Sequence, residues 1–186
     1  AGRLTSSEQT ALLSSFFDAD WHNQIYVYPR YKALFEQRIA GRTFSTQDLT
    51  DLQMWFNLAW FAPELLEAPV SLYDGTRIDL ASLVRKGQGF TRADLRAMLE
   101  AQDAVMRNVV PLHRSLQDAG QIEISTSPFY HPILPLIHDT DLATVDRPGA
   151  QRPARFHAPE DADAHVRQAA QDYAHRFGHR PRGMWP

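Results

Sequence analysis

The sequence contains no cysteine, and its charges are almost balanced. With 0 Cys among 186 residues, disulfides, thiolate catalysis and cysteine-based zinc sites are excluded. The 19 basic side chains face 22 acidic ones, which gives a formal net charge of −3. A protein that holds a polyanion by charge carries a basic excess, so we do not expect a nucleic acid partner.

The sequence also lacks a long hydrophobic run. No apolar stretch approaches the roughly 20 residues that a membrane-spanning helix needs. The first ten residues, AGRLTSSEQT, contain no apolar core of a signal peptide. We therefore expect no membrane partner and a cytoplasmic location. The hydrophobic fraction of 44% is that of a globular chain and excludes a disordered one.

The first two thirds of the chain predict helices with clear start signals. Thr5 and Glu8 form a capping box, in which the hydroxyl and the carboxylate each satisfy a free backbone N–H. Pro29 suits the first turn of a second helix. Apolar residues at helical spacing follow these and later start signals. Six helices are expected, over residues 5–17, 29–41, 45–60, 79–86, 91–120 and 159–178.

The pattern changes after Gly120. Residues 121–125 alternate polar and apolar side chains, which is the period of a strand, and residues 182–186 resemble the start of another. A helix leading to a strand, a loop, a helix and a strand indicates an α/β fold with a parallel sheet. Two strands cannot form such a sheet alone. The chain is therefore either an α-rich domain or a piece of something larger.

The strongest local signal for a functional site lies in residues 120–137. Glu123 is a lone carboxylate between two isoleucines, and the loop that follows it holds Phe129, Tyr130 and His131. Carboxylates accept hydrogen bonds from sugar hydroxyls, and aromatic rings pack on the C–H faces of sugars. The alternative is an edge strand with Glu123 in water and a proline-rich surface loop. His131 alone is more often a hydrogen-bonded structural histidine than a ligand or an acid–base group.

Two groups of histidines and acids contain residue types that can bind a metal. His175 and His179 have metal-ligand spacing, but Gly178 is expected to end the helix between them. The His138-Asp139-Thr-Asp141 run has the composition of a solvated acidic turn. We expect neither group to bind a metal, and we expect no cofactor.

Four segments of the chain resemble the family 57 glycoside hydrolases, in the branch that contains α-amylase-like and α-mannosidase-like members. They are GQIEISTSPFYHPILPLI (120–137), RFHAPEDADAHVRQAAQDYAHRFGHRPRGMWP (155–186), WHNQIYVYPRYKALFEQR (21–38) and DLQMWFNLAWF (51–61). The resemblance implies the helix-rich part of an α/β fold, a (β/α)7 barrel that is incomplete in this chain. It further implies that residues 1–119 are a helical elaboration between early barrel strands. Residues 120–186 would be a strand-loop-helix-strand segment with part of the active-site cleft.

The resemblance also assigns roles to three residues. Glu123 matches the strand carboxylate that contacts substrate, Trp185 matches the aromatic residue just before the nucleophile, and His131 matches the histidine beside the pocket. The family's retaining mechanism uses a nucleophilic Glu and an acid/base Asp. We expect the Glu just after Pro186, the Asp on a later strand and the family's His-Gln-Pro segment before Ala1. No catalytic residue is therefore expected within the chain, which should be inactive alone.

We therefore predict that the chain is part of a retaining glycoside hydrolase or transglycosidase. Like an amylase, this enzyme would act on an α-glucan or oligosaccharide. Two alternatives stay open. One is a non-catalytic carbohydrate-binding or scaffold protein. The other is a metal-dependent polysaccharide deacetylase on a similar barrel.

Overall fold

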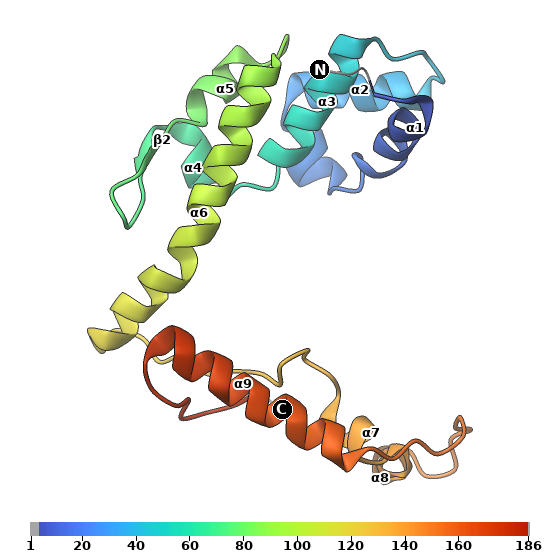
Figure 1. Cartoon of the computed structure of the whole chain (residues 1–186). Coiled ribbons are helices and arrows are strands. Elements are labelled where there is room, and N and C mark those ends of the chain that lie inside the picture. Colours follow the sequence, from blue (N-terminus) through green and yellow to red (C-terminus); the bar gives the residue numbers. More distant parts are fainter. Residues whose placement is uncertain (1–3, 186) are drawn as a thin grey trace. The chain divides into compact units, whose positions relative to one another are not determined.

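The computed structural model describes residues 4–185 and divides the chain into two compact units, residues 1–108 and 109–186. The division falls inside the long helix α6, and each unit is described by itself (Figure 1). The first unit contains α1 (Ser6–Ser15), the π-helix η1 (Trp21–Ile25), α2 (Pro29–Ile39), α3 (Thr46–Leu58), α4 (Pro63–Glu67), β1 (Val70–Ser71), β2 (Arg77–Ile78), α5 (Ala81–Lys86) and the first part of α6 (Arg92–Asp118).

The predicted helix starts of the first unit are confirmed. Thr5 and Glu8 form the capping box of α1, and Ser45 and Asp48 form that of α3. Pro29 occupies the first turn of α2. The apolar faces of these helices meet in one core, which is centred on fully buried side chains of α2, α3 and η1.

A short hairpin completes the first unit. β1 and β2 pair antiparallel around a turn that contains Gly75, whose φ of 86° is unfavourable for any residue with a side chain. The side chain of Asn108, which is buried on α6, accepts a hydrogen bond from the backbone N–H of Asp74 at 2.9 Å. This bond fixes the hairpin against α6.

The second unit contains the end of α6, then α7 (Leu134–His138), the 3-10 turn η2 (Thr140–Leu142), α8 (Ala143–Asp146) and α9 (Pro159–Phe177). α7 packs against α9. The long loop between them is closed at its base, where the backbone N–H of Thr140 donates to the carbonyl of Phe156 at 3.0 Å. The helix predicted over residues 159–178 is confirmed, with Gly178 in the left-handed conformation at its end.

The strands predicted in the second unit are wrong in extent. Residues 121–125 form no ladder; Thr126 makes an isolated parallel bridge with Met184. The described residues are thus mostly helical, consistent with the helix-rich part of an α/β fold. The parallel direction of the bridge is that of such a sheet, but one bridge gives residues 121–125 no neighbouring backbone to pair with.

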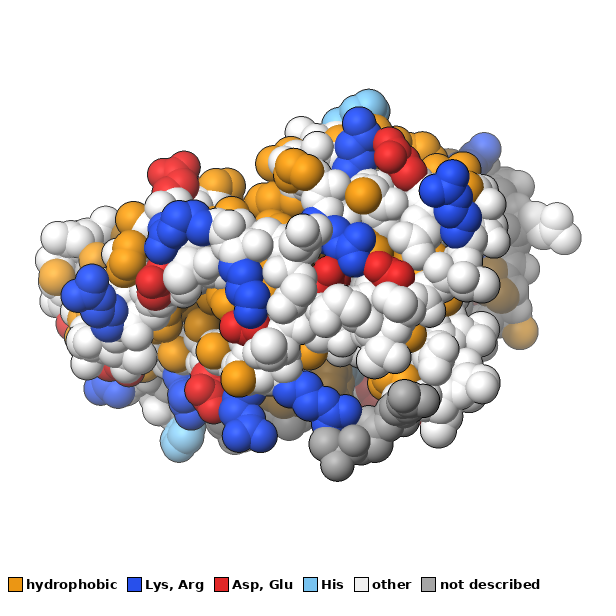
Figure 2. Space-filling model, turned by 90° about the horizontal axis from the view of Figure 1, so that it is seen from above, with side chains coloured by type: hydrophobic (Ala, Val, Ile, Leu, Met, Phe, Trp, Pro, Cys, Tyr) orange, Lys and Arg blue, Asp and Glu red, His pale blue; other side chains and the backbone are white. Residues whose placement is uncertain are grey.

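Charges of both signs share the surface. On the face in Figure 2, basic and acidic side chains lie close to one another. Several are paired one helical turn apart, among them Arg107 with Asp103 and Arg176 with Asp172, both at 2.8 Å. No helix within residues 4–185 is long and apolar enough to cross a membrane.

Candidate functional site

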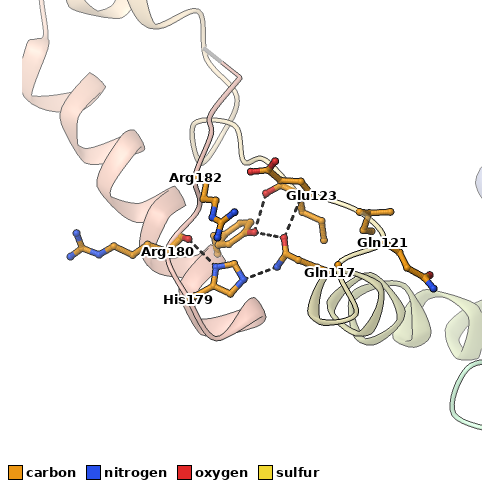
Figure 3. A pocket seen from close by; sticks show the side chains of 10 residues that line it. Gln117, Gln121, Glu123, His179, Arg180 and Arg182 are labelled. Atoms are coloured by element: carbon orange, nitrogen blue, oxygen red, sulfur yellow. Dashed lines mark hydrogen bonds between the residues drawn. The ribbon is translucent and has the colours of Figure 1, made fainter.

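The second unit has a hollow of about 640 Å³ that Glu123 lines (Figure 3). Its wall comes from the end of α6, the segment that follows it, the last turns of α9 and the segment beyond. The lining residues are Gln117, Gly120, Gln121, Ile122, Glu123, Ile124, Tyr173, His179, Arg180 and Arg182.

Two glycines turn the chain around this hollow. Gly120, with a φ of 70°, ends α6 and directs the chain into the segment of Glu123. Gly178, with a φ of 83°, ends α9 and directs the chain into the segment of Arg180. A Cβ atom at Gly178 would also lie only 3.1 Å from the Arg114 guanidinium. Both the positive φ and this close contact favour glycine at the position.

A buried tyrosine joins the walls of the hollow. The hydroxyl of Tyr173 lies 2.8 Å from Oε1 of Gln117 and 2.9 Å from the carbonyl oxygen of Ile124, and its single proton is shared between these two acceptors. Oε1 of Gln117 also accepts the backbone N–H of Ile124 at 3.1 Å. The backbone next to Glu123 is therefore fixed from both α6 and α9.

His179 extends this network through both of its ring nitrogens. Nε2 of Gln117 donates to Nε2 of His179 at 2.8 Å, and Nδ1 of His179 donates to the carbonyl of Arg180 at 2.9 Å. The oxygen and nitrogen of the Gln117 amide cannot be exchanged, because its NH₂ group would then face the N–H of Ile124 and two donors would meet. The arrangement thus requires the tautomer with the proton on Nδ1.

The Glu123 carboxylate is exposed and unengaged. Arg180 and Arg182 line the same hollow, yet no hydrogen bond or ion pair within the described part of the chain joins Glu123 to either of them. The carboxylate is thus available to accept hydrogen bonds from a ligand, and the two guanidinium groups are available to donate them.

The parallel bridge places Trp185 beside Thr126, where the loop with Phe129, Tyr130 and His131 begins; we call this loop the aromatic loop. The backbone N–H of Trp185 donates to the carbonyl of Thr126 at 2.7 Å, and the indole is 69% exposed. Tyr130, four residues after Thr126, is 80% exposed. Because parallel neighbours run in the same direction, residues after Thr126 and after Met184 leave the bridge at the same end.

His131 has a strained backbone. Its N–H donates to the carbonyl of Pro128 at 2.7 Å and closes a turn, and its φ is 51°. A non-glycine residue seldom adopts a positive φ, and the proline that follows it restricts the backbone further. Such strain is concentrated at functional sites in proteins.

The three residues predicted to bind substrate are not in one hollow. Glu123 lines the hollow, whereas His131 and Trp185 are not among its lining residues. Glu123 precedes Thr126 by three residues, about 10 Å along an extended chain. His131 instead follows Thr126, and Trp185 follows its bridge partner Met184.

Sequence reasoning missed His165, which anchors the aromatic loop to α9. Its carbonyl accepts the N–H of Phe129 at 3.2 Å, and its Nδ1 accepts the N–H of Tyr130 at 3.4 Å. The Tyr130 and His165 rings meet edge to face at 5.8 Å. His165 and Tyr173 lie eight residues apart, about two helical turns, and this shared face of α9 was the available signal.

The acidic run after α7 is engaged in ion pairs. Asp139 pairs with Arg155, and Asp141 pairs with Arg152 at 2.6 Å. The guanidinium of Arg155 holds the pKa of the Asp139 carboxyl well below its usual range. No group of three His, Cys, Asp or Glu side chains within residues 4–185 is arranged to hold a metal ion.

The comparison with family models places the chain among the enzymes that cleave glycosidic bonds. The model described as "Glycosyl hydrolase family 57" matches residues 9–186. The chain belongs to glycosyl hydrolase family 57, as the four segments in the sequence had indicated. No curated protein and no solved structure matched the chain.

Proposed function

We propose that the chain is part of a retaining glycosidase or transglycosidase that acts on α-glucans, and that Glu123, His131 and Trp185 bind the sugar. Family membership supports a glycoside hydrolase with a carbohydrate substrate. The observation that carries the assignment of Glu123 is its free carboxylate in a hollow that also presents two arginines.

The chemistry of these groups suits a neutral polyhydroxylated ligand. A carboxylate accepts hydrogen bonds from pairs of sugar hydroxyls, and a guanidinium donates to hydroxyl and ring oxygens. The exposed rings of Tyr130 and Trp185 offer faces on which sugar C–H groups can pack. A retaining glycosidase needs two carboxyl groups only about 5–5.5 Å apart. The proposal gives Glu123 the role of binding the substrate, and bond cleavage is left to other groups.

The test is product analysis with the full-length protein on soluble starch, maltooligosaccharides and mannosides. We expect cleavage of the first two and not of mannosides. Glu123→Gln should raise KM for maltooligosaccharides about 10-fold or more, because it removes a charged acceptor. Glu67→Gln is the control, since Glu67 is an exposed carboxylate of α4.

Three results would count against the proposal. A preference for mannosides would overturn the substrate class. Binding of glucans without turnover would favour a non-catalytic carbohydrate-binding protein. Equal kinetics of Glu123→Gln and Glu67→Gln would remove Glu123 from the site.

A further inference from the structure

The first unit contains a second hollow, of about 680 Å³. None of the proposed sugar-binding residues Glu123, His131 and Trp185 lines it. It lies where α2 begins, beside Trp55 of α3 and the end of α5. Its walls are mainly apolar, with Val27, Pro29, Ala33 and Val84 facing it. This volume is within the range of small-molecule sites.

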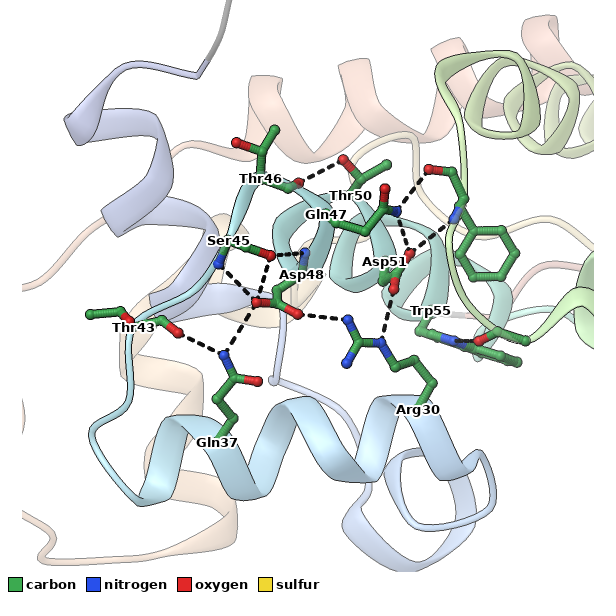
Figure 4. A network of polar contacts seen from close by, with 12 residues as sticks. Arg30, Gln37, Thr43, Ser45, Thr46, Gln47, Asp48, Thr50, Asp51 and Trp55 are labelled. Carbon is green, nitrogen blue, oxygen red and sulfur yellow. Dashed lines mark hydrogen bonds and ion pairs between the residues drawn. The ribbon is translucent and has the colours of Figure 1, made fainter.

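One wall of the hollow is a pair of stacked aromatic rings. The Tyr28 and Trp55 rings lie 4.5 Å apart with 25° between their planes. The Trp55 indole N–H donates to the carbonyl of Gly87 at 2.8 Å, a bond drawn in Figure 4. Phe90 meets Trp55 edge-on at 6.0 Å. The wall is therefore preformed, and a ligand would not have to order it.

The cations at the hollow are already neutralised. Arg30 pairs with Asp48 at 2.6 Å and with Asp51 at 2.8 Å, and both bonds are drawn in Figure 4. Lys86 pairs with Asp94 at 2.6 Å. No unpaired cation is left at the hollow for an anionic ligand, so we expect an uncharged ligand there rather than an anion.

A donor remains unused in this hollow. Within residues 4–185 the hydroxyl of Tyr28 has no hydrogen-bond partner, although its ring is half-buried. Burial raises the pKa of Tyr28, so the hydroxyl keeps its proton at neutral pH. The exposed Gln88 lines the same hollow and brings an amide that can both donate and accept.

We propose that this hollow is a saccharide-binding site of the first unit, which takes the end of a short, uncharged α-glucan. Apolar walls, an aromatic face and a few neutral donors and acceptors match a sugar ring, which has C–H faces and hydroxyl edges. That the saccharide is an α-glucan rests on the proposed function. The site itself rests on the hollow, its neutralised cations and the Tyr28 hydroxyl.

The test follows the indole N–H signal of Trp55 by NMR while maltotriose is added to the protein. The Trp55 signal is identified as the one that Trp55→Phe removes, a change that keeps an aromatic ring against Tyr28. We expect the Trp55 signal to shift saturably, because its hydrogen-bond acceptor Gly87 lines the hollow.

Two variants and a control test the location. Tyr28→Phe keeps the ring stack and should raise the dissociation constant about 2- to 10-fold, the loss of one hydrogen bond. Ala33→Trp should fill the hollow and abolish the shift; Ala33 is exposed, so the change leaves the core untouched. Tyr73→Phe, at an exposed tyrosine outside the hollow, should bind like the parent protein.

The outcomes separate this site from the proposed function. A Trp55 signal that does not move, or equal affinities of Tyr28→Phe, Ala33→Trp and Tyr73→Phe, would overturn the site even if starch is cleaved. If Ala33→Trp fails to fold, Tyr28→Phe against Tyr73→Phe decides the question. A normal titration without glucan cleavage would instead overturn the proposed function alone.

Discussion

The hydroxyl of Tyr173 on α9 lies 2.9 Å from the carbonyl oxygen of Ile124, the residue that follows Glu123. Gln117 of α6 binds the same hydroxyl from the other side at 2.8 Å. The position of the Glu123 carboxylate thus depends on a buried side chain that does not belong to its own segment.

Tyr173→Phe should therefore lower both stability and sugar binding. The change removes a hydroxyl that serves two acceptors and leaves the Ile124 carbonyl without it, at a cost of about 1–3 kcal/mol in the free energy of unfolding. Urea denaturation measures the loss, and Tyr73→Phe is the control because Tyr73 is exposed. Equal stability of the two variants would show that the Tyr173 hydroxyl does not hold this segment.

Replacing His131 should separate backbone strain from side-chain function. His131→Gly removes the penalty of a φ of 51° in a non-glycine residue, so its free energy of unfolding should exceed that of His131→Ala by about 1 kcal/mol. Both variants should bind maltooligosaccharides more weakly. Thermal denaturation checks the first expectation, and identical stability of the two variants would contradict it.

Asp51 of α3 should be the most sensitive charged residue of the first unit. Its carboxylate is 1% exposed and accepts from Arg30 Nε at 2.8 Å, Gln47 Nε2 at 2.8 Å and the Phe90 N–H at 3.0 Å (Figure 4). In Asp51→Asn one oxygen becomes an NH₂ group that faces a donor, at a cost of about 2–4 kcal/mol.

Urea denaturation of Asp51→Asn beside Asp103→Asn checks this expectation. Asp103 pairs with Arg107 on the exposed side of α6, and such a surface pair contributes at most about 1 kcal/mol. A loss of the same size in both variants would contradict the role given to Asp51.

Acid should weaken the first unit through Asp94 and Asp48. Hydrogen bonds from Lys86 and from the Thr91 backbone lower the pKa of Asp94 to about 2. Burial alone would raise the pKa of Asp48, but hydrogen bonds from Ser45 and Arg30 outweigh it and bring the value to about 2. A carboxyl whose pKa is lower in the folded state stabilises the fold above its unfolded pKa, near 4.

This contribution is lost as the pH falls from about 4 to about 2. The stability difference between the parent protein and Asp94→Asn should therefore be largest at neutral pH and vanish near pH 2. Urea denaturation at several pH values measures it. A difference that stays constant down to pH 2 would contradict the origin assigned to the low pKa.

Local signals made much of the helical structure predictable. Each of the capping boxes of α1 and α3 is formed within four consecutive residues. Gly120 and Gly178 end their helices because they adopt a positive φ. The π-helix η1 escaped prediction, since its i→i+5 hydrogen bonds have no composition of their own.

Features that depend on distant residues were predicted less well. The alternation in residues 121–125 is typical of a strand, but a ladder needs neighbouring backbone, and the bridge partner Met184 meets only Thr126. Glu123 stood out in the sequence as a lone carboxylate between isoleucines. The Tyr173–Gln117 contact beside it joins residues 56 positions apart, which no local pattern reveals.

The anomeric form of the first product released from maltopentaose tests the central proposal most directly. Proton NMR during the first minutes of hydrolysis by the full-length protein distinguishes the α- and β-anomers before they interconvert. A retaining enzyme that acts on α-glucans releases the α-anomer, and this is the predicted result. Initial release of the β-anomer, or no release from maltopentaose at all, would contradict the proposal.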